Sequence, residues 1–182
     1  MKYYSSYLIQ LKNHYKLTGQ FPVQSDRGNN YILVAYHYDA KNILTTPLKN
    51  RTGPCILSVI TKIHNKLRKR VLTPKIHIVD NEVSEDLKKY SEDSDIKFQL
   101  VPPHMNRRND PERAVRTFKN HFIAALCTVD PLFPFYLWDH LLPQVIMILN
   151  MLRQFRINPG LSAYEQVDGI HNFERTPLAP LG

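Results

Sequence analysis

The chain has 182 residues, of which 43% are hydrophobic, enough for one domain with its own core. Lysine and arginine outnumber aspartate and glutamate by 24 to 16, which gives a formal net charge of +8. This charge favours polyanionic partners, above all nucleic acid, and does not define the fold. The chain has two cysteines and no apolar leader segment. We therefore expect an intracellular protein rather than a disulfide-stapled secreted one.

The first half of the chain alternates strand and helix patterns. Apolar, β-branched and aromatic residues predict strands at 15–23 and 31–38, with a turn at 24–30 between them. Further segments are predicted in this order: a strand at 42–48, a helix that opens at 50–54, a strand at 75–79, a helix at 83–90 and a strand at 96–101. The order predicts an α/β fold, with helices packed on a five-stranded mixed sheet.

Two long helices are expected to follow. Asp110 and Pro111 are a typical N-cap and first residue of a helix, which should run to about Cys127. A second helix, kinked or restarted at Pro143, should run to about Arg153. Polar residues interrupt the apolar run at 132–152, so we interpret it as a core helix and expect no membrane span. The predicted organisation is an N-terminal extension at 1–13, a core at 14–157 and a loop-rich C-terminal extension at 158–182.

Three other residues receive structural interpretations. Trp138 is expected in the core, and Cys127 is expected to be a small buried hydrophobic residue. His77 lies between Ile76 and Ile78 in the predicted fourth strand, so its side chain should point away from the apolar face.

Two carboxylates stand where a sheet protein can present a ligand group. Asp80 directly follows the predicted fourth strand, and Glu112 lies in the first turn of the first long helix. Arg116 and Lys119 share the helix face of Glu112 by their spacing. Glu112 could equally interact with the helix dipole or form an i,i+4 ion pair with Arg116. Arginines gather at the same helix end, and the candidate DNA-binding residues are therefore Arg107, Arg108, Arg113, Arg116 and Lys119.

Several short motifs together resemble the integrase core of copia-like and related LTR retrotransposons. One group is Thr18-Gly19-Gln20-Phe21-Pro22-Val23 with Arg27-Gly28-Asn29-Asn30-Tyr31, and another is Asp80-Asn81-Glu82. A third group is Pro102-Pro103-His104, Glu112-Arg113-Ala114 and Arg116-Thr117-Phe118-Lys119-Asn120, followed by Leu141-Leu142-Pro143-Gln144 and Arg156-Ile157-Asn158-Pro159. The resemblance covers about 15–182, nearly the whole chain.

The resemblance implies an RNase H-like fold and an Asp, Asp, Glu triad that holds two Mg²⁺ or Mn²⁺ ions for polynucleotidyl transfer during DNA integration. Asp80 matches the second member of the triad and Glu112 the third, as catalytic and metal-binding residues. The first-Asp position is occupied by Lys16, two residues before Thr18. An ammonium at a metal-ligand position repels the cation. Asp39, after the second strand, is an alternative third ligand if hairpin pairing brings it near Lys16, although an ion pair with Lys16 or a plain strand-end role is also open.

These observations leave three functional hypotheses. The first is an integrase-type DNA-binding core with a degenerate active site, which acts on retroelement ends and target DNA, forms a homo-oligomer and works in the nucleus. The second is an active enzyme that uses Mg²⁺ or Mn²⁺, with Asp39 or a shifted register supplying the third ligand. The third is a non-catalytic DNA-binding or scaffold protein, either a remnant of a transposable element or a domesticated copy.

Overall fold

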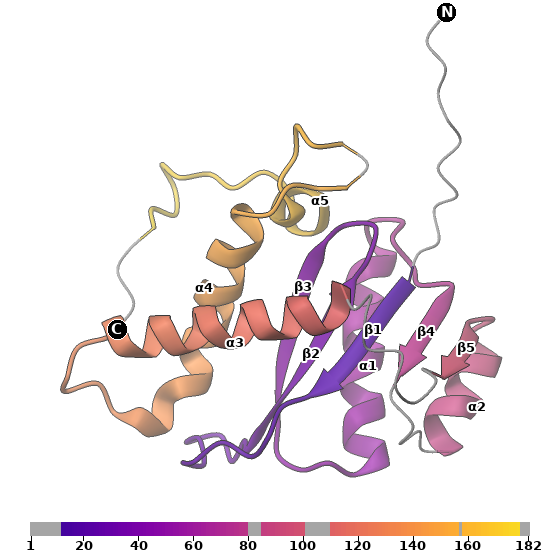
Figure 1. Cartoon of the computed structure of the whole chain (residues 1–182), viewed down its shortest axis with the longest axis horizontal. Coiled ribbons are helices and arrows are strands. Elements are labelled where there is room, and N and C mark those ends of the chain that lie inside the picture. Colours follow the sequence, from indigo (N-terminus) through magenta and orange to yellow (C-terminus); the bar gives the residue numbers. More distant parts are fainter. Residues whose placement is uncertain (1–11, 80–84, 101–109, 157, 179–182) are drawn as a thin grey trace, which may run out of the picture.

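A mixed β-sheet forms the centre of the computed structural model, which describes residues 12–79, 85–100, 110–156 and 158–178. The sheet has five strands in the order β3-β2-β1-β4-β5 (Figure 1). Strands β1, β2 and β3 pair antiparallel, and β4 and β5 continue from β1 in parallel. The strands are β1 (Lys12–Leu17), β2 (Tyr31–His37), β3 (Asn42–Leu48), β4 (Ile76–Val79) and β5 (Lys97–Leu100). The expected mixed α/β sheet flanked by helices is thus confirmed.

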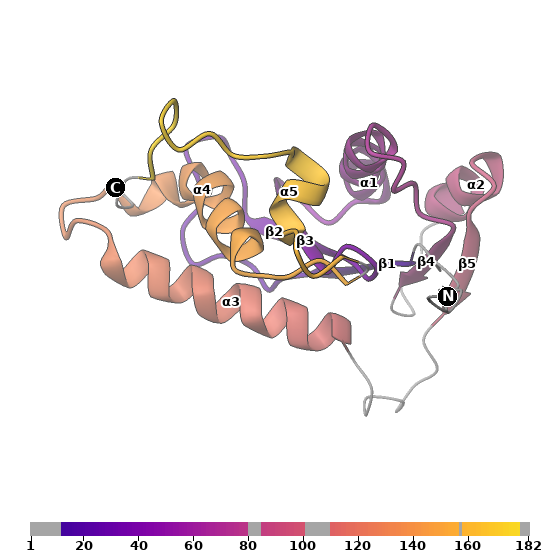
Figure 2. The ribbon, with the colours of Figure 1, turned by 90° about the horizontal axis from the view of Figure 1, so that it is seen from above.

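Helices cover both faces of the sheet, as Figure 2 shows with α1 and α3 on opposite sides. One core joins α1, α2 and α5 to one face of the sheet, and a second joins α3 and α4 to the other face. The helices are α1 (Gly53–Arg68), α2 (Glu85–Asp93), α3 (Asp110–Thr128), α4 (Trp138–Met151) and α5 (Ala163–Asp168), with a 3-10 turn at η2 (Phe135–Leu137). None of the helices in the described ranges is long and apolar enough to cross a membrane.

Several predicted boundaries shift because tertiary packing overrides the local pattern. The first strand ends at Leu17 rather than at residue 23, because Phe21 turns inward and stacks on Trp138 with ring centroids 4.2 Å apart. Trp138 is fully buried, as expected. The second long helix does not restart at Pro143, because α4 starts at Trp138 and runs through this proline.

Two side-chain predictions were wrong. Cys127 is exposed, because it lies about half a turn around α3 from the buried Phe118 at about 100° per residue. His77 is fully buried. Helices cover both faces of the sheet, so a residue that points away from one apolar layer enters the other.

The short helix α5 lies within the segment that the sequence suggested was rich in loops. A capping box starts it: Ser162 accepts a hydrogen bond from the backbone of Glu165, and Glu165 accepts one from the backbone of Ser162. Ala163 and Val167 of this helix are buried. The segment after α4 therefore returns to the sheet and contributes to the core.

The free edge of β3 is met by a side chain from α4. Asn150 is buried; its Oδ1 accepts a hydrogen bond from Ile43 N at 2.9 Å, and its Nδ2 donates to Ile43 O at 2.8 Å. The amide thus satisfies both backbone groups of a residue in an edge strand. This pairing fixes α4 against the sheet on the side where α3 also lies.

Candidate functional site

Lys16 and Glu112 lie together where α3 crosses the sheet. Alternate residues of β1 face opposite layers, so buried Tyr15 packs against the α1 layer and Lys16 faces the α3 layer. The Nζ atom of Lys16 is 4.0 Å from Oε1 of Glu112, and the two side chains are 44% and 43% exposed. An ion pair this exposed contributes about 0–1 kcal/mol to stability. Substitution of either residue should therefore leave the fold intact.

The end of β4 lies beside Lys16 in the sheet. Val79, the last residue of β4, pairs with Tyr15, the neighbour of Lys16 in β1. Asp80 follows Val79 in the sequence but lies outside the described residues, as do Arg107 and Arg108. The predicted proximity of the Asp80 and Glu112 carboxyl groups thus stays a prediction.

The remaining predicted cations divide between two flanks of α3. Arg116 and Lys119 are exposed and share the flank of Glu112, since residues three and four apart lie one above the other. Arg113 lies about 100° around the helix from Glu112. It lines a groove on another flank of α3. The structure therefore joins Arg116 and Lys119 to the Glu112 site and assigns Arg113 to another surface.

Asp39 cannot replace the missing first carboxylate. In the β1–β2 hairpin Lys16 pairs with Val34, whereas His37 pairs with Asn13. Asp39 follows two residues after His37, so it lies more than about 10 Å along the strand from Lys16, at about 3.4 Å per residue. It is buried, and its Oδ2 atom has no hydrogen-bond partner among the described residues. The hypothesis of an active site rescued by Asp39, and that of an ion pair between Asp39 and Lys16, are therefore both wrong.

The described residues do not fit an intact two-metal centre. A hard divalent cation requires converging carboxylate oxygens, and the first-Asp position instead brings an ammonium to 4.0 Å from a Glu112 oxygen. This ammonium occupies the space beside the carboxylate and opposes the charge of an incoming cation. Among the described residues at this place, the cations Lys16, Arg116 and Lys119 can attract a phosphate, and Glu112 is the carboxylate beside them.

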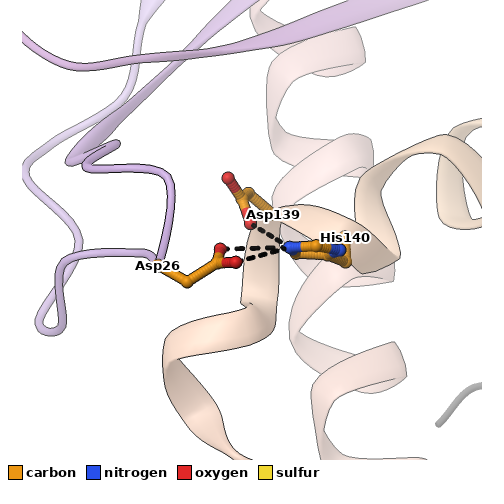
Figure 3. A group of neighbouring side chains, drawn as sticks. All are labelled: Asp26, Asp139 and His140. Atoms are coloured by element: carbon orange, nitrogen blue, oxygen red, sulfur yellow. Dashed lines mark hydrogen bonds and ion pairs between the residues drawn. The ribbon is translucent and has the colours of Figure 1, made fainter.

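A second acidic group, not recognised in the sequence, connects the loop between β1 and β2 to the start of α4 (Figure 3). Ligand atoms of Asp26, Asp139 and His140 all lie within 4.8 Å of one another. The His140 Nε2 atom is 3.0 and 3.1 Å from the two oxygens of Asp26 and 3.7 Å from Asp139 Oδ1. Asn29 donates from Nδ2 to Asp139 Oδ2 at 2.7 Å. The adjacent residues Asp139 and His140 were the only sequence signal, because Asp26 is distant in the chain.

The hydrogen bonds of this group make it a structural connector rather than a metal centre. Arg27 Nη2 lies 3.1 Å from Nδ1 of His140, and a guanidinium can only donate. Nδ1 is therefore the acceptor, and the ring proton lies on Nε2, directed at Asp26. A metal ion at Nε2 would replace this proton. The neutral ring would then carry its proton on Nδ1, so the hydrogen bond from Arg27 to Nδ1 would be lost as well.

Asp139→Ala should lower the free energy of unfolding by about 1–3 kcal/mol, because it leaves the buried Asn29 amide without its acceptor. His140→Ala should lower it by less than about 1 kcal/mol, because this side chain is exposed. Urea unfolding of the two variants measures the difference. Equal losses would show that the Asn29–Asp139 bond is not the main contribution.

A buried polar network lies on the opposite face of the sheet. His77 Nε2 is 2.9 Å from His64 Nε2, and His77 Nδ1 is 3.1 Å from Ser91 Oγ. Tyr15 and Tyr90 hydroxyls contact the two nitrogens of His64, at 2.7 and 2.9 Å. Burial lowers the pKa of His64 to about 4. Burial, with a smaller contribution from His64, lowers the pKa of His77 to about 3. Both rings are therefore neutral at pH 7 and serve as hydrogen-bonding core residues.

The fold defined by this sheet and its two helical layers is the RNase H-like fold of integrase catalytic cores. No protein-family model and no curated protein sequence matches the chain, so the likeness rests on solved structures. The crystal structure of the BIV integrase catalytic core has a TM-score of 0.63 and 14% identity, covering 87% of this chain and 93% of that one. The HTLV-2 integrase catalytic core, in complex with magnesium and in a dimeric form, has a TM-score of 0.60 and 14% identity, covering 87% and 95%.

A chain of a larger integrase assembly is also similar in structure to this chain. The simian T-cell lymphotropic virus intasome, in complex with the PP2A regulatory subunit B56 gamma, has a TM-score of 0.65 at 14% identity. The match covers 94% of this chain and 59% of that one. At this level of identity the likeness shows the fold, and the function has to be argued from the side chains.

Proposed function

We propose that this domain is an integrase-type core that binds DNA through its phosphates and is impaired in metal-dependent catalysis. The observation that carries the proposal is the ion pair between Lys16 and Glu112, 4.0 Å long. In the family that the sequence resembles, a carboxylate takes the place of Lys16. This ion pair supports a surface that offers a phosphate-attracting charge at the position where the resembled family has a metal-binding one.

The charge of the chain supports a nucleic-acid partner. The net charge of +8 includes the exposed Arg116 and Lys119 on the flank of α3 that also carries Glu112. Lysine and arginine on an exposed helix are suited to contacting phosphates, and such contacts position a duplex without reading its sequence. Arg107 and Arg108 belong to the same proposed surface by their place in the sequence.

The origin in a copia-like or related LTR retrotransposon is part of the proposal and rests on the sequence motifs. The core that the sequence predicted at 14–157 is extended in this proposal to run from β1 through α5, because Val167 packs in the same core as the sheet. Retroelement ends and target DNA are the proposed nucleic-acid partners. A homo-oligomer and action in the nucleus follow if the domain still takes part in integration. The dimeric HTLV-2 core among the structural neighbours supports the oligomer.

Replacement of both Arg116 and Lys119 by alanine should reduce the salt dependence of duplex binding. Each phosphate contact contributes about 0.9 to the slope of log K against log salt, so the slope should fall by about 1.8. Fluorescence anisotropy with a labelled duplex of random sequence, titrated at several salt concentrations, measures the change.

The matched control is the alanine double variant of Lys62 and Lys69, which also removes two positive charges. Lys62 lies on α1 and Lys69 directly follows it, and both are exposed. Because α1 covers the other face of the sheet, this control should keep the parental slope. Equal losses in the two double variants would mean that net charge alone drives binding and that the flank of Glu112 is not the DNA surface.

A further inference from the structure

A basic groove lies on the flank of α3 that faces away from Glu112. It has a volume of about 640 Å³ and is bounded by α3, the turn between β2 and β3, and the segment that follows α4. Four cationic side chains line it: Lys41, Arg113, Arg153 and Arg156. None of the described residues that line it is acidic. The charges come from three separate segments, so the groove exists only in the folded chain.

Two of its arginines are held in place by β2 and by the turn that follows it. Arg153 donates from Nε to Lys41 O at 2.8 Å, and its guanidinium lies over the Tyr36 ring, 5.8 Å from the centroid. The Arg156 guanidinium lies 3.9 Å from the centroid of the Tyr38 ring. Stacking on an aromatic ring and a backbone bond through Nε fix the plane of a guanidinium. Arginines ordered before binding lose less entropy when an anion arrives.

The turn that contributes Lys41 has an unusual backbone. Lys41 has a φ of 49°, a left-handed conformation that L residues with a Cβ rarely adopt. Its carbonyl oxygen accepts the hydrogen bond from Arg153. The turn therefore brings a lysine to the rim of the groove and binds one of its arginines at the same time.

The groove is separate from the surface of Lys16 and Glu112. Arg113 and Thr117 line the groove, whereas Glu112 and Arg116 lie about 60–140° away around the helix axis. The buried residues Ala114 and Phe118 occupy the side of the helix that packs on the sheet. A ligand in the groove therefore meets α3 from a different direction than one beside Glu112.

We propose that this groove binds the phosphodiester backbone of a nucleic-acid strand at a second site on the domain. Planar guanidinium groups match phosphate oxygens in pairs, and a groove with four cations suits consecutive phosphates. The rings of Tyr36 and Tyr38 are covered by arginines, so they are not open faces for base stacking, and recognition is of the backbone. The proposal adds to the proposed DNA binding, but it concerns other residues and is tested separately.

The test compares two charge-removing variants in the full-length chain. Lys41→Gln with Arg153→Gln removes two groove charges, and the alanine double variant of Arg116 and Lys119 removes two from the other flank. Both are titrated with the same duplex at several salt concentrations. The groove variant should flatten the slope by about 1.8, and combination with the other pair should flatten it by about twice that amount. Arg153→Lys, which keeps the charge, should retain most of the parental slope.

A second readout distinguishes the nucleic acid from a free anion. In amide NMR spectra of the unaltered chain, the duplex should shift the signals of Lys41, Arg153 and Gln154, whatever happens at Arg116. An unchanged slope in the groove variant, with a native thermal midpoint, would overturn the proposal. So would shifts of these amides with inorganic phosphate and none with the duplex, because the groove would then hold a small anion. If the groove variant flattens the slope and the alanine double variant of Arg116 and Lys119 does not, the result counts against the proposed function and supports the groove proposal.

Discussion

Replacement of Lys16 by aspartate should tighten the binding of Mn²⁺ by at least about tenfold. The change removes an ammonium 4.0 Å from a Glu112 oxygen and supplies a carboxylate at the position where the resembled family has one. Two unit charges about 4 Å apart interact by about 4 kcal/mol at the effective dielectric of a protein surface. A third of that energy already changes affinity about tenfold. Isothermal titration calorimetry with Mn²⁺ on the parent and the variant measures the difference.

Two further variants separate charge from ligation. Lys16→Met removes the positive charge without adding a ligand, so its affinity should lie between those of the parent and Lys16→Asp. Glu112→Gln in the Lys16→Asp background should reverse most of the gain. If Lys16→Asp binds Mn²⁺ no better than the parent, position 16 is not part of a metal site.

The same variants test the proposed impairment. The unaltered chain should show no strand cleavage that depends on Mg²⁺ or Mn²⁺ in a nicking assay with labelled duplex DNA. Metal-dependent nicking by the unaltered chain that disappears with Glu112→Gln would contradict the impaired site.

Mild acid should destabilise the fold by about 4 kcal/mol between pH 7 and pH 5. The pKa values of His64 and His77 are lowered to about 4 and about 3 in the folded chain, against about 6.5 for an unperturbed histidine. Below pH 6.5 the unfolded chain therefore binds more protons than the folded one, and stability falls as the pH falls. Each histidine contributes about 1.4 kcal/mol per pH unit, or about 2 kcal/mol at pH 5. Burial lowers the pKa of His37 as well, and its contribution has the same sign.

Urea unfolding at a series of pH values measures this slope. His77→Phe keeps an aromatic ring in the core and cannot take up a proton, so it should reduce the slope between pH 6.5 and pH 4 by roughly half. Val59→Ala is the control: Val59 is buried, so its truncation should lower stability by about the same amount at every pH. If the free energy of unfolding of the unaltered chain did not change between pH 7 and pH 5, the histidine network would have to open before the fold unfolds.

Local signals in the sequence were enough to predict most of the fold. Asp110 and Pro111 give the start of α3, and the third strand was predicted with the bounds that β3 has. The position of Asp39 could not be predicted in the same way. The loop at 18–30 is long and irregular, so the register between β1 and β2 cannot be counted from a short turn.

The candidate site was predictable only in part. The proximity of Lys16 to Glu112 agrees with the family motifs, and spacing alone did not give it. The groove cations Lys41 and Arg153 come together through the return of the chain after α4. The partners of His77 lie on α1, α2 and β1, and a single strand pattern cannot reveal such distant partners.

The pairing of Asn150 with β3 also determines how the domain can associate with other chains. An open strand edge with free amides and carbonyls invites another strand to add to it, which leads to aggregation or to a sheet shared between subunits. In β3 the outward backbone groups of Ile43 are already taken by Asn150, and Pro47, two alternations further along the same strand, has no N–H to offer. An incoming strand would find few bonding partners along this edge. Copies of this domain should therefore not pair through the β3 edge, and this edge should resist fibre-like stacking during folding.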